Sequence, residues 1–156
     1  MAIILDGKAV AAKVKGEVKA KVDVLKQEGK RIPALAVILV GEDPASAVYV
    51  RNKKKDCEEV GFLSIGHTLP AQTTQEELIA LIDKLNADET VDGILCQLPV
   101  PKHIDSNAVL ERIAPDKDVD CFHPSNVGKL MTGEDGFLPC TPSGVMRMLD
   151  DGRMDD

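Results

Sequence analysis

The chain has 156 residues and a formal net charge of −7, with 44% hydrophobic, 29% charged and 3% aromatic residues. The acidic balance argues against a nucleic-acid partner and against a basic membrane-binding surface. No apolar run approaches the roughly 20 residues that a membrane span needs, and the first residues do not have the pattern of a signal peptide. We therefore expect a cytoplasmic globular domain with a core of Val, Ile, Leu and Ala.

The four cysteines predict free thiols. Cys57, Cys96, Cys121 and Cys140 form no C-x-x-C pair, and disulfides are rare in cytosolic proteins. The spacing of these cysteines and of the histidines matches no common zinc pattern. We therefore expect no bound metal.

Helices and strands are predicted to alternate from the start of the chain. Residues 3–5 are apolar and predict a short strand, and valines at helical spacing predict a helix over residues 8–28. A continuous apolar run at residues 34–40 predicts a strand that is buried on both faces. A helix over residues 46–61 follows, with a proline just before it and Gly61 at its end.

Two more strands are predicted at residues 62–69 and 91–98. Between them, overlapping Thr-x-x-Glu patterns at Thr73 and Thr74 predict a capped helix that ends near Asn86. Strand and helix therefore alternate at about 30 residues per unit, as in βαβ motifs. This alternation predicts an α/β fold, a three-layer αβα-type domain with a mainly parallel sheet built from βαβ units.

The last third of the chain has a weaker pattern. A short helix is predicted over residues 106–113. Residues 116–136 are polar and weakly periodic, which predicts a long loop of the kind that often carries function. A final helix is predicted with Thr141 as its N-cap and Pro142 at its first position, and with little after it to pack against.

Polar side chains are predicted to gather at the carboxyl ends of the strands, where open α/β sheets bind ligands. Tyr49 and Lys53 stand four residues apart on a predicted helix, so their side chains share one face. Gln97 ends a strand, a rigid Pro-x-Pro turn follows, and Asp120 lies in the long loop. A lysine beside a neutral amide is not held as a cation by an ion pair, and a desolvated lysine amine can act as a base.

Each of these residues also has a structural interpretation. Lys53 belongs to a Lys-Lys-Lys run, which is typical of a solvated helix face, and Tyr49 could pack half-buried. Gln97 could satisfy a strand end, and Asp118 and Asp120 could cap the loop. Tyr-x-x-x-Lys also occurs in short-chain dehydrogenases, which need a Gly-rich dinucleotide loop. The chain contains neither Gly-x-Gly nor a phosphate-binding P-loop, which argues against that class.

Four motifs in chain order resemble one enzyme family, the bifunctional methylenetetrahydrofolate dehydrogenase/methenyltetrahydrofolate cyclohydrolases. The resemblance covers nearly all of residues 1–150. The motifs are Pro44-Ala45-Ser46 with Tyr49-Val50-x-x-Lys53-x-Lys55-x-Cys57-Glu58-x-Val60-Gly61, then Asp92-Gly93-Ile94-Leu95-x-Gln97-Leu98-Pro99-x-Pro101, then Pro115-x-Lys117-Asp118-Val119-Asp120-x-Phe122-His123, and Pro139-Cys140-Thr141-Pro142-x-Gly144.

The resemblance implies a folate-dependent enzyme of one-carbon metabolism. Such enzymes oxidise 5,10-methylenetetrahydrofolate with NADP, and water then opens the 5,10-methenyl product to 10-formyltetrahydrofolate. In the family, a catalytic domain and a Rossmann NADP-binding domain face each other across a cleft, typically in a homodimer. The resemblance therefore implies that residues 1–150 are the catalytic domain, that residues 151–156 are a truncated tail, and that the NADP-binding domain is absent.

The resemblance also implies roles for individual residues. Lys53 matches the central catalytic lysine, which assists proton movements in the cyclohydrolase step. Gln97 matches the glutamine that tunes this lysine, and Tyr49 matches the tyrosine that stacks on the folate. The residues implied to bind substrate are Tyr49, Gln97, Leu98, Pro99 and, against the pterin, Asp120.

Two residues depart from the family pattern. Cys121 stands where the family has Gly, directly after Asp120. Since a Gly at that point serves a positive φ or a close backbone approach, Cys121 is expected to strain the Asp120 loop. Cys96 stands in place of a Val before Gln97, which is a small change that suits a core position.

Two other interpretations of the chain stay open at this point. Without a dinucleotide-binding half, we expect no NADP-dependent dehydrogenase activity from these residues and at most weak cyclohydrolase activity. The first alternative is therefore a non-catalytic folate-binding or dimerising fragment. The second is an unrelated α/β binding module, which would require all four motifs to coincide by chance.

Overall fold

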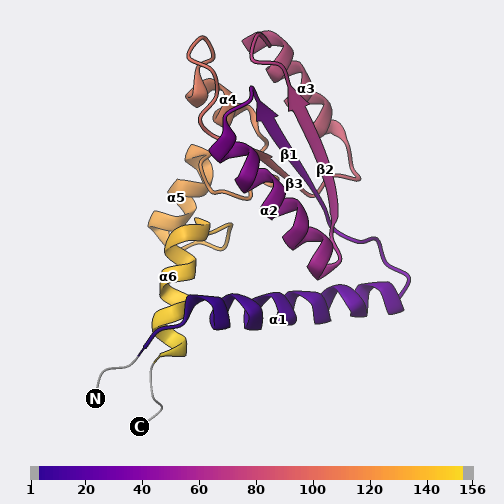
Figure 1. The fold of residues 1–156 in the computed structure, drawn as a ribbon, viewed down its shortest axis with the longest axis vertical. Coiled ribbons are helices and arrows are strands. Elements are labelled where there is room, and N and C mark those ends of the chain that lie inside the picture. Colours follow the sequence, from indigo (N-terminus) through magenta and orange to yellow (C-terminus); the bar gives the residue numbers. More distant parts are fainter. Residues whose placement is uncertain (1–3, 153–156) are drawn as a thin grey trace.

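The structure is a computed structural model in which residues 4–152 are described. A three-stranded parallel sheet with the order β2-β1-β3 forms its centre (Figure 1). The strands are β1 (Ala34–Val40), β2 (Leu63–Leu69) and β3 (Gly93–Cys96). In the register, Ala36 of β1 lies between Ile65 of β2 and Ile94 of β3. The predicted parallel sheet is confirmed, although β3 is shorter than the segment predicted for it.

Helices cover both faces of this sheet. α2 (Pro44–Val60) connects β1 to β2 and packs on one face, whereas α3 (Gln75–Ala87) connects β2 to β3 and packs on the other. α4 (Ser106–Arg112) follows β3 and lies against α3. The crossovers therefore produce the predicted three-layer αβα arrangement, because parallel strands need a helix on a face of the sheet at each crossover.

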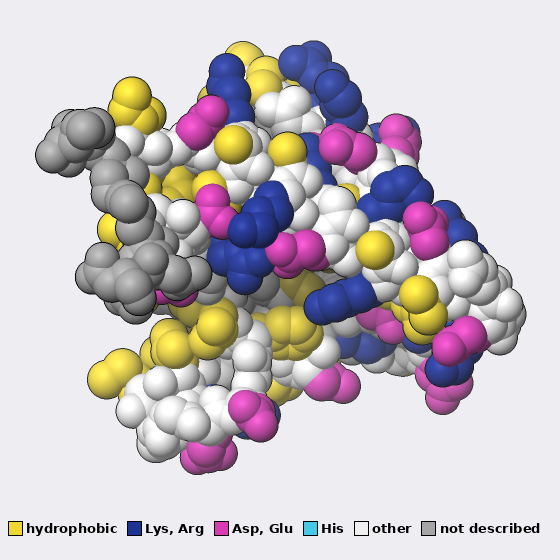
Figure 2. Space-filling model, turned by 90° about the horizontal axis from the view of Figure 1, so that it is seen from below, with side chains coloured by type: hydrophobic (Ala, Val, Ile, Leu, Met, Phe, Trp, Pro, Cys, Tyr) yellow, Lys and Arg dark blue, Asp and Glu magenta, His cyan; other side chains and the backbone are white. Residues whose placement is uncertain are grey.

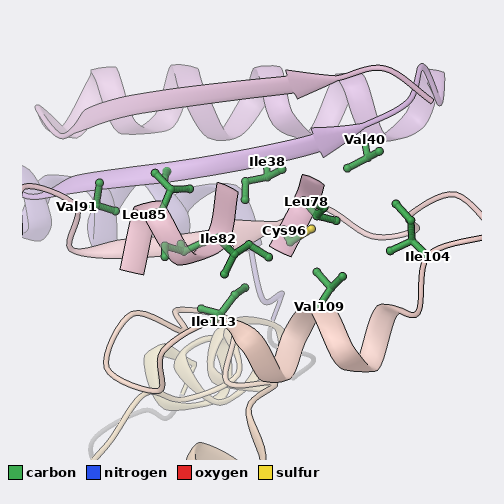
Figure 3. Close-up of a cluster of buried hydrophobic side chains, with 12 residues drawn as sticks. Ile38, Val40, Leu78, Ile82, Leu85, Val91, Cys96, Ile104, Val109 and Ile113 are labelled. Carbon is green, nitrogen blue, oxygen red and sulfur yellow. The ribbon is translucent and has the colours of Figure 1, made fainter. Parts of the chain in front are cut away.

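The main hydrophobic core lies between the sheet, α3 and α4 (Figure 3). Ile38 on β1 and Ile82 on α3 are fully buried there. Burial of one such side chain stabilises the fold by about 1.5–3 kcal/mol, so this side of the sheet is the rigid support of the domain. The buried members of the core are Ala36, Ile38, Val40, Leu78, Ile82, Leu85, Val91, Ile94, Cys96, Ile104, Val109 and Ile113.

Local signals explain where the two crossover helices begin and end. Of the two overlapping capping boxes, the one at Thr74 forms: Glu77 N donates to Thr74 Oγ1 at 3.2 Å, and Thr74 N donates to Glu77 Oε2 at 2.8 Å. α2 has Pro44 in its first turn and ends at Gly61, whose φ of 88° lies in the left-handed region. Only glycine adopts that conformation without a steric cost.

The long helix α1 (Gly7–Gln27) runs along the base of the molecule and meets α6 (Cys140–Asp151) near its N-terminal end (Figure 1). Glu17 of α1 accepts a hydrogen bond at 2.7 Å from the guanidinium of Arg147 in α6. The expectation that the last helix has little to pack against is therefore wrong, since α1, from the other end of the sequence, packs against it.

Three further sequence predictions need correction. The strand predicted at residues 3–5 is not formed at Ile4 and Leu5, because Leu5 packs against Gly152 at the end of α6 instead of pairing with a strand, and residue 3 lies outside the described residues. The predicted loop at residues 116–136 contains a helix, α5 (Pro124–Thr132). Its nine residues include a glycine and several polar residues, which concealed it, although a proline begins it and Gly133, with a φ of 74°, ends it.

The third correction concerns the start of α6. The N-cap is Pro139 rather than Thr141, and no side chain caps the helix. Pro142 therefore lies inside the first turn instead of at its first position. The first turn of a helix tolerates proline because its N–H groups have no partner within the helix.

The outer edge of β3 is covered by the segment at residues 117–119. Ile94 N donates to Lys117 O at 2.8 Å, and Ile94 forms a parallel bridge with Asp118. A Cβ atom on Gly93 would lie 2.6 Å from Val119 Cγ1, so only glycine permits this close approach. The segment that carries Asp120 is thereby fixed beside the strand that ends at Gln97.

Charged side chains spread over much of the face seen in Figure 2, and hydrophobic side chains gather where that face is hollowed. Within residues 4–152, no helix is both long enough and apolar enough to cross a bilayer.

Candidate active site

Lys53 and Gln97 are in direct contact. Lys53 Nζ donates to Gln97 Oε1 at 3.1 Å, and Gln97 Nε2 donates to Leu98 O at 2.7 Å. Because the Gln97 amide group is engaged by the backbone, its carbonyl oxygen is left to face the lysine. Lys53 thus has a neutral acceptor as its hydrogen-bond partner, as expected, and both side chains are half-buried.

Lys53 and Asp120 both line two cavities on the α2 side of the sheet. The larger has a volume of about 630 Å³ and extends from Lys53 past β1 and β3 to Phe137 and Cys140. The smaller has a volume of about 190 Å³ and is also lined by Gln97, Leu98 and Phe122. Mostly apolar walls with a few converging polar groups are typical of a small-molecule site.

Burial and charge act in opposite directions on the Asp120 carboxyl. Burial raises its pKa, the nearby Lys53 lowers it, and Asp118 raises it further, with a net rise. Burial likewise raises the pKa of the Cys140 thiol, where Asp120 adds to the rise and Lys53 opposes it. The cavity therefore holds an amine, a carboxyl group and a thiol in a partly dehydrated environment, where electrostatic interactions are stronger than in water.

The backbone at Cys121 adopts a φ of 58°, and this is the one positive φ found at a non-glycine residue of the described chain. The conformation that glycine would favour is thus present, although the side chain is cysteine, and Cys121 is buried. Left-handed backbone at a residue with a Cβ costs about 1–2 kcal/mol. Strain is therefore stored beside Asp120, as expected.

Tyr49, Leu98 and Pro99 occupy different positions around the cleft. Tyr49 lies one helical turn before Lys53 on α2, is 61% exposed, and lines neither of the two cavities. Leu98 lines the smaller cavity. Pro99 lies beyond it and lines a separate hollow of about 320 Å³ with Pro101 and others. The structure thus brings Lys53, Gln97, Leu98 and Asp120 together and leaves Tyr49 and Pro99 at the margin.

Other residues line the cleft that were not selected from the sequence as site residues. Phe122, two positions after Asp120, lines the smaller cavity, and Phe137 and Cys140 line the larger one. Phe122 and Cys140 both stand in the motifs quoted above, which is the signal that could have identified them. Phe137 has no such signal, because its position depends on how α5 returns the chain to the cleft.

The cysteines and acidic residues show no sign of a metal centre in the part of the chain that the structure describes. All four cysteines are free thiols, as expected. No cluster of three or more His, Cys, Asp or Glu side chains among residues 4–152 is arranged to hold a metal ion.

The parallel sheet and the cleft at the carboxyl end of β3 define an α/β catalytic domain with a lysine amine, a neutral amide and a carboxyl group. The chain belongs to the tetrahydrofolate dehydrogenase/cyclohydrolase family: the family's catalytic-domain model matches residues 5–120. This match covers the segment from α1 to Asp120 and therefore includes Lys53, Gln97 and Asp120.

Curated relatives support this membership. The chain is 57% identical over 155 residues to the bifunctional protein FolD 2 of Geobacter metallireducens, covering 99% of this chain and 54% of that protein. It is 60% identical over 153 residues to the bifunctional protein FolD of Anaeromyxobacter dehalogenans, covering 97% of this chain and 54% of the relative. The chain thus spans about half the length of the curated relatives it matches.

Solved structures show the same fold. The bifunctional enzyme FolD from Campylobacter jejuni superimposes with a TM-score of 0.91 at 54% identity, covering 94% of this chain and 52% of that one. The Trypanosoma brucei dehydrogenase-cyclohydrolase, solved with NADP cofactor and inhibitor, superimposes with a TM-score of 0.90 at 39% identity. The superposition covers 96% of this chain and 51% of that one.

Proposed function

We propose that this chain is the folate-binding, catalytic half of an enzyme of one-carbon metabolism. The parent reactions are oxidation of 5,10-methylenetetrahydrofolate to 5,10-methenyltetrahydrofolate with NADP, and hydrolysis of that product to 10-formyltetrahydrofolate. The observation that carries the proposal is the 3.1 Å contact of Lys53 Nζ with Gln97 Oε1, beside Asp120 in one cleft. The family membership and the printed names of the relatives support the same assignment.

The hydrolytic step requires proton transfers that one amine can perform. Water adds to the carbon that bridges N5 and N10 of the methenyl cation and loses a proton as the C–O bond forms. The bond from that carbon to N5 then breaks as the hydroxyl oxygen releases its remaining proton and becomes the formyl C=O, N5 takes up a proton, and the formyl group stays on N10. In this proposal, Lys53 Nζ accepts the proton from water and returns a proton to N5. The net reaction consumes one water and releases one proton.

Gln97 and Asp120 have complementary roles in the proposal. Gln97 Oε1 orients the lysine without an ion pair that would stabilise the ammonium. A neutral amine is also the better neighbour for a cationic substrate, since like charges repel. Asp120 binds the amino group and ring N–H of the pterin through its carboxyl oxygens. Tyr49 stacks its exposed ring on the folate. Leu98 and Pro99, which follow β3, contact the folate as well.

The residues of this chain do not fit a dinucleotide cofactor. No Gly-x-Gly sequence occurs among the 156 residues, whereas the pyrophosphate of such a cofactor is bound at a Gly-rich turn. In the proposed division of labour, residues 1–150 bind the folate, and binding of NADP belongs to a Rossmann domain outside these residues. The hydride-transfer step is therefore not among the roles proposed for residues 1–150.

A hydrolysis assay with three proteins tests the role of Lys53. Purified 1–156, its Lys53→Met variant and its Lys54→Met variant are compared for hydrolysis of 5,10-methenyltetrahydrofolate above the rate in buffer alone. Lys54 is the matched control, because it is the next residue on α2, its side chain is 64% exposed and its partner Glu58 is 4.0 Å away. We expect Lys53→Met to lower the rate above background by about 100-fold or more, as loss of a general acid-base does. Lys54→Met should stay within about twofold.

Equal rates above background in wild type and Lys53→Met would refute the role of Lys53. A second candidate function has one observation in its favour, namely the exposed apolar side chains on α5 and α6. In that case the chain is a non-catalytic folate-binding or dimerising fragment. Titration calorimetry with 5-formyltetrahydrofolate distinguishes the two, since binding without turnover would support the fragment.

The proposal includes a homodimer in the cytoplasm. Exposed apolar side chains on α5 and α6 support self-association, because burial of apolar side chains is a driving force for association. Four free thiols support a reducing compartment. Light scattering after gel filtration tests the oligomeric state. The exposed side chains in question are Val127, Leu130, Met131, Val145, Met146 and Leu149.

A further inference from the structure

The loop between Asp118 and His123 carries Asp120 and is held by two buried polar side chains. Asp118 and Asn126 are each only 2% exposed. Asn126 Nδ2 donates to Asp118 Oδ2 at 2.9 Å and to Pro115 O at 2.8 Å. His123 N donates to the same Asp118 oxygen at 2.8 Å. One carboxylate oxygen thus ties both ends of the loop together.

The same two residues connect the loop to the rest of the domain. Asp118 bridges to Ile94 on β3, and Cys121 N donates to Asp118 O at 3.3 Å. Asn126 is the buried residue of α5, so it fixes that helix against the loop. Asp118 therefore connects the loop to the sheet, and Asn126 connects it to α5. We call these two hydrogen-bonded residues the clamp. Buried polar groups of this kind are costly unless they are paired, which makes the geometry well defined.

We propose that Asp118 and Asn126 are positioning residues that hold the Asp120 carboxyl in the cleft beside Lys53. This inference rests on the proposed function for its effect on ligand, since Asp120 is there the group that binds the pterin. The strain at Cys121 gives the clamp a physical purpose. A loop with a φ of 58° at a non-glycine residue would relax if it were not restrained at both ends. Asp118 and Asn126 supply the restraint without touching the ligand.

Two measurements on the full chain test the clamp. The first is binding of 5-formyltetrahydrofolate by calorimetry. The second is the rate at which N-ethylmaleimide alkylates Cys121, followed by peptide mass spectrometry, with buried Cys96 on β3 as the internal reference. The variants are Asn126→Ala, Asn126→Ser and Asp118→Asn. The matched control is Asn86→Ala, which removes two side-chain hydrogen bonds to the backbone, at Arg112 and Ala114.

Asn126→Ala leaves a buried carboxylate oxygen without one donor, so we expect about tenfold weaker binding and about tenfold faster alkylation of Cys121. Cys96 should keep its wild-type alkylation rate. Asp118→Asn should stay within about threefold of wild type in both measurements, because its amide oxygen can still accept both hydrogen bonds. Asn86→Ala should match wild type. A merely structural role would lower the stability of Asn126→Ala and Asn86→Ala alike and would not single out Cys121.

Unchanged alkylation of Cys121 in Asn126→Ala overturns the clamp, and so does wild-type affinity in a variant whose loop has opened. Asn126→Ser replaces the alanine variant in both measurements if the latter does not fold. Failure of the wild-type chain to bind 5-formyltetrahydrofolate counts against the proposed function. In that case the alkylation rates alone decide on the clamp, with faster modification in the Asn126 variants supporting it.

Discussion

Lys53 and Gln97 are 44 residues apart in the sequence, yet Lys53 Nζ lies 3.1 Å from Gln97 Oε1. α2 follows β1, and Gln97 follows β3, which pairs directly with β1. The contact therefore depends on the parallel pairing of these two strands. Its chemical consequence depends on the second hydrogen bond of Gln97, to Leu98 O, because that bond determines which end of the amide faces the lysine.

Gln97→Glu should lower hydrolysis of 5,10-methenyltetrahydrofolate by about 10–100-fold. A carboxylate at this position pairs with the ammonium form of Lys53 and leaves it unable to take a proton from water. Binding of 5-formyltetrahydrofolate should change by less than about threefold, because the side chain keeps its size. Gln72→Glu, which adds the same charge on an exposed loop, is the control. Wild-type turnover by Gln97→Glu would show that the neutral amide has no catalytic importance.

Asp120→Asn should make the domain more stable and weaken its binding of folate. Burial raises the pKa of the Asp120 carboxyl, so the native state holds its proton at a pH where the unfolded chain has lost it. The free energy of unfolding therefore falls as the pH rises from about 4 to the native pKa, and the loss is complete above it. Asparagine avoids this loss, for a gain of about 0.5–2 kcal/mol at pH 7.

Urea denaturation at pH 7 and at pH 3.5 measures this effect. The gain in stability should largely disappear at the lower pH, where the carboxyl group is protonated in the native chain and mostly protonated in the unfolded chain. A variant that is less stable than wild type at pH 7, or a difference that is independent of pH, would contradict the assignment of burial as the cause.

Cys121→Gly should be more stable than Cys121→Ala by about 1 kcal/mol. Both variants lose the buried sulfur, so the comparison between them isolates the backbone. At a φ of 58°, alanine keeps the steric cost of its Cβ, whereas glycine does not. Thermal or urea denaturation of the two variants measures the difference. The reverse order of stability would mean that the loop relaxes to a negative φ once the sulfur is removed.

Asp92→Asn should cost about 1 kcal/mol of stability at neutral pH. Asp92 accepts hydrogen bonds from the Arg31 guanidinium at 2.6 and 2.7 Å and from Ala34 N at 2.8 Å. The pairing with Arg31 holds the pKa of Asp92 below its usual range. The stabilisation is thus fully present above the unfolded pKa of about 4 and is lost as the pH falls through the native pKa. The estimate stays small because the pair is partly exposed.

Denaturation of wild type and Asp92→Asn at pH 7 and at pH 2.5 checks this prediction. The difference in the free energy of unfolding between the two proteins should be smaller at pH 2.5. Asp83→Asn serves as the control, since Asp83 also pairs with a guanidinium, that of Arg112, but within residues 4–152 it accepts no hydrogen bond from a backbone amide, as Asp92 does from Ala34 N. It should therefore cost less than Asp92→Asn. A difference in the free energy of unfolding between wild type and Asp92→Asn that is larger at pH 2.5 would contradict the ion pair as its cause.

The sheet and its crossover helices could be predicted because their signals are local. The apolar run of β1, the capping box at Thr74 and the glycine that ends α2 each act within a few residues. The helix α5 was missed because its side chains are mostly exposed, with Asn126 as its buried residue. A helix of nine residues that contains a glycine and buries one amide has little in its sequence to distinguish it from a loop.

The residues that form the candidate site could be predicted more readily than the positions of their side chains around the cleft. Lys53, Gln97 and Asp120 all meet at the cleft, because strand ends are brought together by the topology. The exposure of Tyr49 and the marginal place of Pro99 could not be predicted, since both depend on side-chain packing around the cleft. The packing of α1 against α6 could not be predicted either, because it is a contact between the two ends of the sequence.

Residues 117–119 cover the outer edge of β3, and this limits how the sheet of one molecule can pair with the sheet of another. An uncovered strand edge can recruit a strand from another molecule. Because Lys117 and Asp118 already bond to β3, the edge open to a further strand within residues 4–152 is that of β2. Any extension of the sheet from one molecule to the next would therefore proceed from β2. It would leave the cleft of Lys53 and Asp120 accessible, because that cleft opens beside β3.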